Sequence, residues 1–74
     1  MLWWNKKKKE SKLAEELEDD VRLARTLGKK AAYRTFKSTQ DETFARQWCK
    51  NRGYAIEVDH TDGEEVWYKI WGWE

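Results

Sequence analysis

The sequence contains no proline and only one cysteine, Cys49, among its 74 residues. A lone cysteine excludes an internal disulfide and is typical of proteins kept in a reducing compartment. No stretch is apolar enough to span a membrane. Leu2, Trp3 and Trp4 precede a basic run, whereas a secretory signal has its basic residues before a longer apolar segment. We therefore expect a cytoplasmic protein without a membrane span.

Residues that carry catalysis or bind metals are also scarce. His60 is the only histidine, and one histidine with one cysteine cannot complete a zinc site. Cys49 as a nucleophile would need a base within reach, and its apolar neighbours instead indicate a small buried residue on a helix face. There is no glycine-rich phosphate loop. We predict a protein that is not an enzyme, with no catalytic residue, metal ion or cofactor.

Charged residues are abundant but nearly balanced, with a formal net charge of +1. Residues 1–37 contain eleven Lys or Arg and six Asp or Glu, whereas residues 38–74 contain four and eight. The first half is therefore basic and the second acidic, a polarity that can steer association with a partner. A dedicated nucleic-acid binder is more often basic overall.

The length predicts one domain, near the lower limit for folding on a single core. Residues 1–10 are expected to form a basic flexible tail, because the lysine run repels itself, and residues 11–74 the single α+β domain. Ser11 is the expected N-cap of an amphipathic helix over residues 12–27, and Gly28 ends it. The apolar residues of this helix fall in one stripe: Leu13, Leu17, Val21, Ala24 and Leu27.

The remaining sequence predicts a βαββ unit. Residues 31–36 read as a strand, and a capping box of Thr39 and Glu42 begins a helix that ends at Gly53. Residues 54–60 and the segment after Gly63 read as the strands of a hairpin. The predicted fold is α+β in the order α-β-α-β-β, an N-terminal amphipathic helix followed by a three-stranded sheet with a C-terminal hairpin.

The length of the hairpin loop sets which residues share a face. A two-residue Asp-Gly turn would mix aliphatic and charged residues on both faces. A three-residue loop over residues 61–63 would pair Val58 with Val66 and Ile56 with Tyr68, and we prefer it because it collects the aliphatic residues on one face. The second helix should then cover that face with the residues it has on one side: Phe44, Ala45, Trp48 and Cys49.

Residues 33–72 also resemble a known family in outline. The segments "YRTF", "STQDETFARQWCKNRGY", "AIEV" and "EVWYKIWG" follow one another as in the opening of sporulation-related repeat domains, and the pattern looks like half of a ferredoxin-like fold. The resemblance rests on the element order and on a Gly-Tyr pair after the helix. The full repeat domain has a closing helix and strand that this sequence does not show. The resemblance implies a fold and no function.

The last strand carries three tryptophans with a period of two. In a strand, this spacing places Trp67, Lys69, Trp71 and Trp73 on one face. This face is either a partner-binding surface, since tryptophan is enriched at interface hot spots and in base-stacking platforms, or a second core layer covered by the first helix. Acidic neighbours on the same face, Glu57, Asp59 and Glu65, argue against a phosphate-bearing partner.

Lysines form a run near the start of the chain, at Lys6, Lys7, Lys8 and Lys9. With Trp3 and Trp4 this run is a candidate electrostatic site for phosphate or an anionic membrane surface, and otherwise a solvated tail.

The sequence is typical of a small non-enzymatic protein-binding module that acts through its aromatic sheet face. A short, charged chain without catalytic motifs is of the kind that viruses and mobile elements use to inhibit or modulate a host protein, which would place it in the host cytoplasm. One alternative is binding of RNA or single-stranded nucleic acid through the tryptophan face and the basic half. The other is a homodimer in which sheet edges or tryptophan faces pair.

Overall fold

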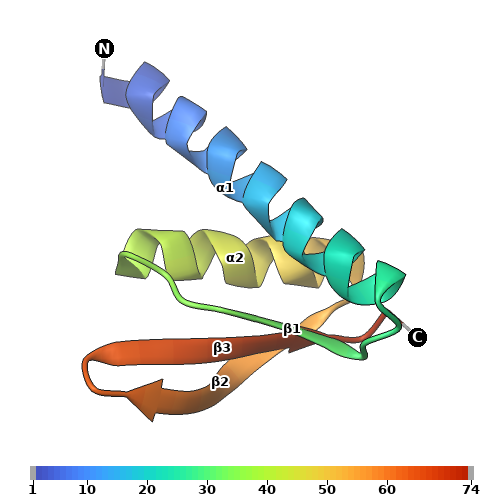
Figure 1. Cartoon of the computed structure of the whole chain (residues 1–74). Helices are drawn as coiled ribbons and strands as arrows, with labels where there is room; N and C mark the ends of the chain where they lie inside the picture. Colours follow the sequence, from blue (N-terminus) through green and yellow to red (C-terminus); the bar gives the residue numbers. More distant parts are fainter. Residues whose placement is uncertain (1, 74) are drawn as a thin grey trace.

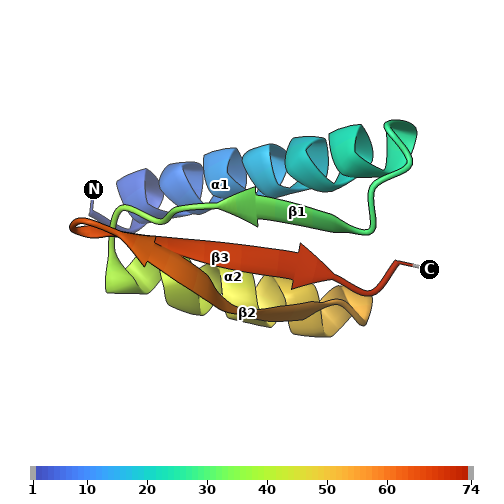
Figure 2. The same cartoon turned by 60° about the horizontal axis from the view of Figure 1, so that its bottom comes forward.

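The protein folds as two helices on one side of a three-stranded sheet. The computed structural model describes the backbone of residues 2–73 and the side chains of residues 12–73. The elements are α1 (Leu2–Thr26), β1 (Ala31–Arg34), α2 (Thr39–Arg52), β2 (Ala55–Asp62) and β3 (Glu65–Trp71). The last strand is central, in the order β1-β3-β2, and both of its neighbours run antiparallel to it. Figure 1 and Figure 2 show both helices on the same face of the sheet. The predicted α+β class and element order are confirmed.

Helix α1 is longer than expected. It begins at Leu2, so Ser11 lies inside the helix. The prediction that Ser11 is the N-cap was therefore wrong. The first ten residues contain no glycine or proline that would stop a helix. Gly28, with φ 74°, ends α1, and the Lys29 N–H donates to the carbonyl of Ala24 at 2.8 Å in a Schellman-type closure. Leu27 lies past the last helical residue and is exposed rather than part of the core. Within residues 2–73, no helix combines the length and apolarity needed to cross a membrane.

Both ends of helix α2 are capped. Ser38 is the N-cap, one residue before the predicted position, and its Oγ accepts a hydrogen bond from the Asp41 N–H at 3.2 Å. Thr39 is therefore the first helical residue. Gly53 ends the helix as predicted, with φ 75°, and the Tyr54 N–H donates to the Cys49 carbonyl at 2.8 Å.

The hairpin register differs from the prediction by two residues. Asp62 pairs with Glu65, so the loop is the two residues Gly63 and Glu64, with the glycine at φ 62° in the first position, as type II′ turns require. A bulge between Val58 and His60 then realigns the strands, and Ile56 pairs with Ile70. An even shift keeps the same residues facing the helices, although the predicted partners were wrong.

The core lies between the two helices and the inner face of the sheet. Its largest fully buried side chains are Leu17, Cys49 and Ile70, one from each of α1, α2 and β3. The buried cluster is Leu13, Leu17, Val21, Ala45, Trp48, Cys49 and Ile70, with Phe44 and Ile56 packed against it. Phe44 and Trp48 both take part in this core, and Trp48 also borders the space between α1 and α2. Val58 and Val66 lie nearer the hairpin turn and are exposed, contrary to the prediction that they join the core.

Arg34 ties helix α1 to the edge strand β1. Its Nη1 lies 3.0 Å from Asp20 Oδ2 and its Nη2 lies 3.0 Å from Glu16 Oε1. The Arg34 side chain is only 18% exposed, so this bridge is shielded more than an ordinary surface pair. Burial raises the pKa of Asp20, and the neighbouring Arg34 only partly opposes that rise. The bridge fixes α1 on the helix-covered side of the sheet.

Candidate functional site

The outer face of β3 carries three of the predicted site residues. Tyr68 and Ile70 are buried toward the helices, so the alternating residues Trp67, Lys69 and Trp71 point to the other side of the sheet. Helix α1 packs on the inner side through Leu13, Leu17 and Val21. No helix of residues 2–73 covers the outer face, as Figure 2 shows. Helix α1 therefore does not cover the tryptophans, and the alternative of a second core layer under α1 is wrong.

Strand pairing adds Tyr33, which the sequence alone did not assign to this face, and places the expected neighbour Glu57 there as well. Tyr33 on β1 and Glu57 on β2 both pair directly with Lys69, and directly opposed residues share a face. Tyr33 is 50% exposed. The cross-strand partners of Trp71 are Ala31 and Ala55, which are too small to cover an indole. We call this surface the aromatic face and define it by Tyr33, His60, Trp67, Lys69 and Trp71.

Contacts within the aromatic face hold its indoles in place. The Lys69 Nζ lies 5.2 Å from the centre of the Trp71 ring, a cation–π contact. The His60 ring stacks on Trp67 with centroids 6.0 Å apart and planes 10° from parallel. His60 Nδ1 is in turn 2.6 Å from Asp59 Oδ2. Side chains ordered before binding lose less conformational entropy on association, which favours recognition.

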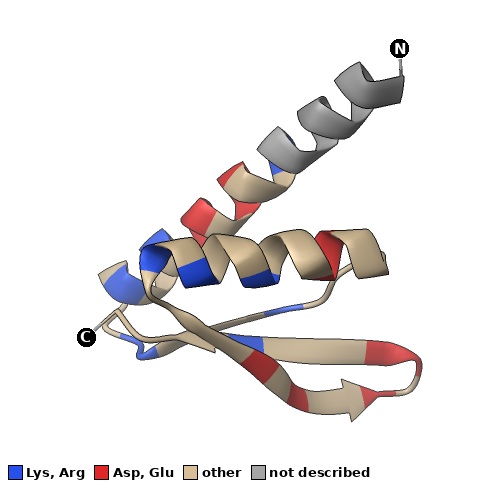
Figure 3. Ribbon diagram, turned by 180° about the vertical axis from the view of Figure 1, so that it is seen from behind, with Lys and Arg blue, Asp and Glu red and all other residues tan. Residues whose placement is uncertain are grey.

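Charge divides the aromatic face into two ends. A hollow of about 700 Å³ lies between β1 and the end of β3, and it is bordered by Lys29, Lys30, Tyr33, Lys69 and Trp71. The hairpin end is acidic, as Figure 3 shows, with Asp62, Glu64 and Glu65. Along the sequence, Lys69 is the only cation that alternation places on this face. The turn after α1 brings two more lysines to the same end.

Trp73 does not share this face, contrary to the prediction. Strand β3 ends at Trp71, and Gly72 has φ 115°, which breaks the alternation. The Trp73 ring packs edge-on against Tyr54 with centroids 5.6 Å apart. Its Nε1 donates a hydrogen bond to the Lys29 carbonyl at 3.2 Å. Trp73 therefore closes one end of the core rather than extending the candidate surface.

The second predicted site, the run Lys6, Lys7, Lys8 and Lys9, falls outside the side chains that the structure describes. Its backbone belongs to α1. Its role as an electrostatic site stays a prediction.

Cys49 is fully buried between α2 and the core. Burial raises the pKa of its thiol from 9.0 to about 11, although Arg52 and Arg46 act in the opposite direction. His60 lies on the other face of the sheet, since it pairs with Trp67. Among residues 12–73, no three His, Cys, Asp or Glu side chains gather so that they could hold a metal ion.

We expect Cys49 in the folded protein to react with a disulfide reagent at pH 8 at least about 100-fold more slowly than in the denatured chain, since each pKa unit is a tenfold change in thiolate. Following the absorbance of the released thiol, with and without urea, measures the ratio. Because the unfolded chain loses this proton near pH 9 and the folded chain only near pH 11, stability should also fall as the pH rises above 9. Native labelling at the denatured rate would contradict the burial of this thiol.

No protein-family model matches the chain, and no curated protein or solved structure matches it significantly. The resemblance of residues 33–72 to sporulation-related repeat domains therefore rests only on the element order and the Gly-Tyr pair after the helix.

Proposed function

We propose that this protein is a small binding module that recognises a protein partner through the aromatic face. The observation that carries the proposal is a central strand whose outer side bears Trp67, Lys69 and Trp71, with Tyr33 beside them and no helix of residues 2–73 above them. Tryptophan and tyrosine supply large contact areas at low entropic cost and dominate interface hot spots. An aromatic surface of this kind gives affinity without a deep pocket.

The acidic end of the face favours a protein over a nucleic acid. Glu57 pairs directly with Lys69, so one carboxylate stands beside the central cation. Asp62, Glu64 and Glu65 continue the negative charge toward the turn. Phosphate groups passing over this half would meet repulsion, whereas a protein partner can offer its own basic residues there.

A second candidate function is supported by the hollow at the other end. Lys29, Lys30 and Lys69 border it together with Tyr33 and Trp71. Aromatic rings set among lysines are the arrangement by which proteins stack single-stranded bases and hold the backbone. Short single-stranded RNA or DNA over this basic end is therefore the alternative.

The salt dependence of binding separates the two. A partner is captured from lysate with the immobilised protein, with and without nuclease, and its affinity is then measured between 50 and 200 mM salt. For a protein partner, nuclease should leave capture intact and the affinity should change only a few-fold. A single strand held by three lysines should lose roughly twentyfold, from a slope near 0.7 per phosphate contact.

The variant Lys29→Gln sharpens the comparison, because Lys29 borders the hollow but is not one of the residues of β3. A protein partner centred on the tryptophans should bind this variant almost as well as the original. Loss of capture after nuclease, together with a salt slope that falls by about 0.7 in Lys29→Gln, would transfer the function to single-stranded nucleic acid.

A further inference from the structure

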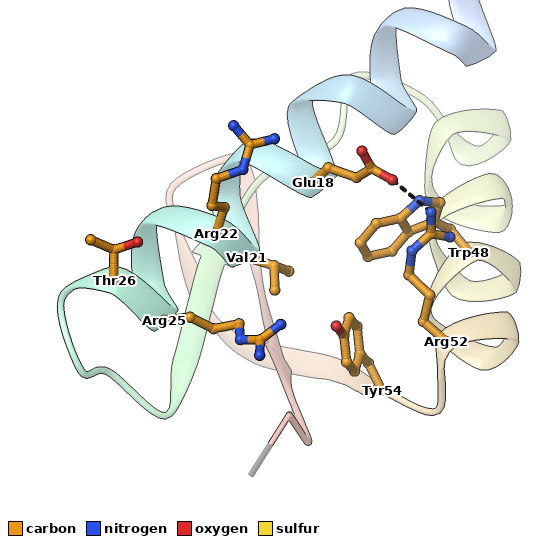
Figure 4. Close-up of a pocket in the computed structure, with 8 residues that line it drawn as sticks. All are labelled: Glu18, Val21, Arg22, Arg25, Thr26, Trp48, Arg52 and Tyr54. Atoms are coloured by element: carbon orange, nitrogen blue, oxygen red, sulfur yellow. Dashed lines mark hydrogen bonds and ion pairs between the residues drawn. The ribbon is translucent and has the colours of Figure 1, made fainter.

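A second concave site lies on the helix side of the sheet, away from the aromatic face. The cleft, of about 570 Å³, opens between the C-terminal halves of α1 and α2. Its polar and aromatic lining consists of Glu18, Arg22, Arg25, Thr26, Trp48, Arg52 and Tyr54, drawn in Figure 4. Figure 3 shows basic residues gathered at the same ends of both helices. Nothing in the proposed function uses this cleft.

The lining of the cleft contains three arginines and only one carboxylate. Arg52 Nη2 pairs with Glu18 Oε1 at 2.7 Å, which uses the one carboxylate in the lining. Arg22 lies 3.3 Å from Asp19, but both side chains are about 70% exposed, so solvent screens this pair. Arg25 makes no ion pair or hydrogen bond with any side chain of residues 12–73. The lining therefore keeps an excess of two positive charges.

An unpartnered buried donor lies in the wall of the same cleft. Trp48 is only 6% exposed, and among the described residues its Nε1 has no hydrogen-bond acceptor. The guanidinium of Arg52, which pairs with Glu18, lies over the Trp48 ring at 4.2 Å from its centre. Figure 4 draws these three side chains together. Buried polar groups are almost always hydrogen-bonded, but this N–H is itself enclosed beside the Arg52 side chain, so an oxygen from outside the chain reaches it only if that side chain moves.

Arginines near helix C-termini also have a simpler explanation, since cations there offset the helix dipole. That explanation accounts for Arg25 and Arg52 as charges. It does not account for the open volume or for the direction of the Arg25 and Tyr54 side chains. Figure 4 draws the Arg25 guanidinium and the Tyr54 hydroxyl turned into the space between the helices.

We propose that this cleft binds the phosphate group of a small organic phosphate. Two excess positive charges match a phosphate dianion, and guanidinium groups bind phosphate oxygens through two parallel N–H donors. The Tyr54 hydroxyl is a further donor in the lining. The rings of Trp48 and Tyr54, 5.9 Å apart, offer an apolar wall for the organic part of the ligand.

Phenyl phosphate is the probe for this site, because it joins a dianion to an aromatic ring. In a titration of the ¹⁵N-labelled protein at pH 7.5, we expect the Trp48 indole signal to shift saturably and those of Trp67 and Trp71 to stay in place. Arg25→Gln should weaken binding at least tenfold. Lys12→Gln removes the same charge from an exposed position of α1 and should weaken it less than twofold.

Related probes make the proposal refutable. Inorganic phosphate should bind more weakly than phenyl phosphate, because it lacks the ring, and benzenesulfonate should bind more weakly because it carries a single charge. Equal losses in Arg25→Gln and Lys12→Gln would show general charge attraction and overturn the site. Equal affinity for benzenesulfonate, or shifts confined to Trp67 and Trp71, would overturn it as well.

Discussion

Replacement of Trp48 by alanine is expected to lower the free energy of unfolding by about 3–5 kcal/mol, as large aromatic truncations do in protein cores. Trp48 is almost completely buried and belongs to the cluster that joins α1, α2 and β3. Its ring also contacts Tyr54 and the Arg52 guanidinium. A chain of 74 residues has a total stability of only about 4–11 kcal/mol at typical values per residue. Urea denaturation followed by circular dichroism should therefore show a much lower midpoint or an unfolded variant.

Two further variants separate loss of packing from other effects. Trp48→Phe should cost clearly less than the alanine change, because it keeps most of the ring and removes the buried N–H that has no acceptor. Leu23→Ala, at an exposed position of α1, should shift stability by no more than about 0.5 kcal/mol. A Trp48→Ala variant with the original urea midpoint would contradict the packing of α2 against the sheet.

The elements of this fold could be predicted because their signals are local. The spacing of Leu13, Leu17 and Val21 is enough to define the buried stripe of α1, and those residues are buried. Phe44 and Trp48 share the core-facing side of α2 for the same reason, and Gly53 ends that helix. None of these assignments needed knowledge of the partner element.

The hairpin register could not be predicted, because two loops fit the same letters. Gly63 can serve as the left-handed residue of a three-residue loop or as the first residue of a two-residue type II′ turn. The structure uses the second, and a bulge beside Asp59 shifts the pairing so that the inward-facing residues of β2 lie opposite those of β3. A bulge leaves no consistent mark in the sequence, so the pairing of Ile56 with Ile70 follows only from the folded sheet.

The candidate site was predictable along one strand and not across strands. Alternation alone assigns Trp67, Lys69 and Trp71 to one side of β3. Tyr33 joins them only because β1 pairs with β3, which is a property of the tertiary fold. Likewise the apolar stripe of α1 fits either side of a sheet, and the inner side is chosen by the whole packing, including the bridge from Arg34.

Trp71→Ala is expected to weaken binding of the partner by about 2 kcal/mol or more, roughly thirtyfold, while the protein stays folded. Trp71 is half-buried on the aromatic face, where it lies opposite Ala31 and Ala55 and contacts Lys69. Its removal therefore takes away contact area without opening the core. Calorimetric titration with the captured partner measures the affinity, and the dispersion of amide signals confirms the fold.

Trp73→Ala is the matched control, because it removes the same side chain two residues further along the chain. Trp73 packs against Tyr54 and donates to the Lys29 carbonyl, so its loss should lower the urea midpoint and leave the affinity of the folded fraction nearly unchanged.

The pair Lys6→Glu with Lys8→Glu should alter the association rate and its salt dependence more than the dissociation rate. An interface centred on Trp71 cannot lose that indole without losing affinity. If the lysine changes abolished binding and folded Trp71→Ala bound normally, the aromatic face would therefore not be the binding surface.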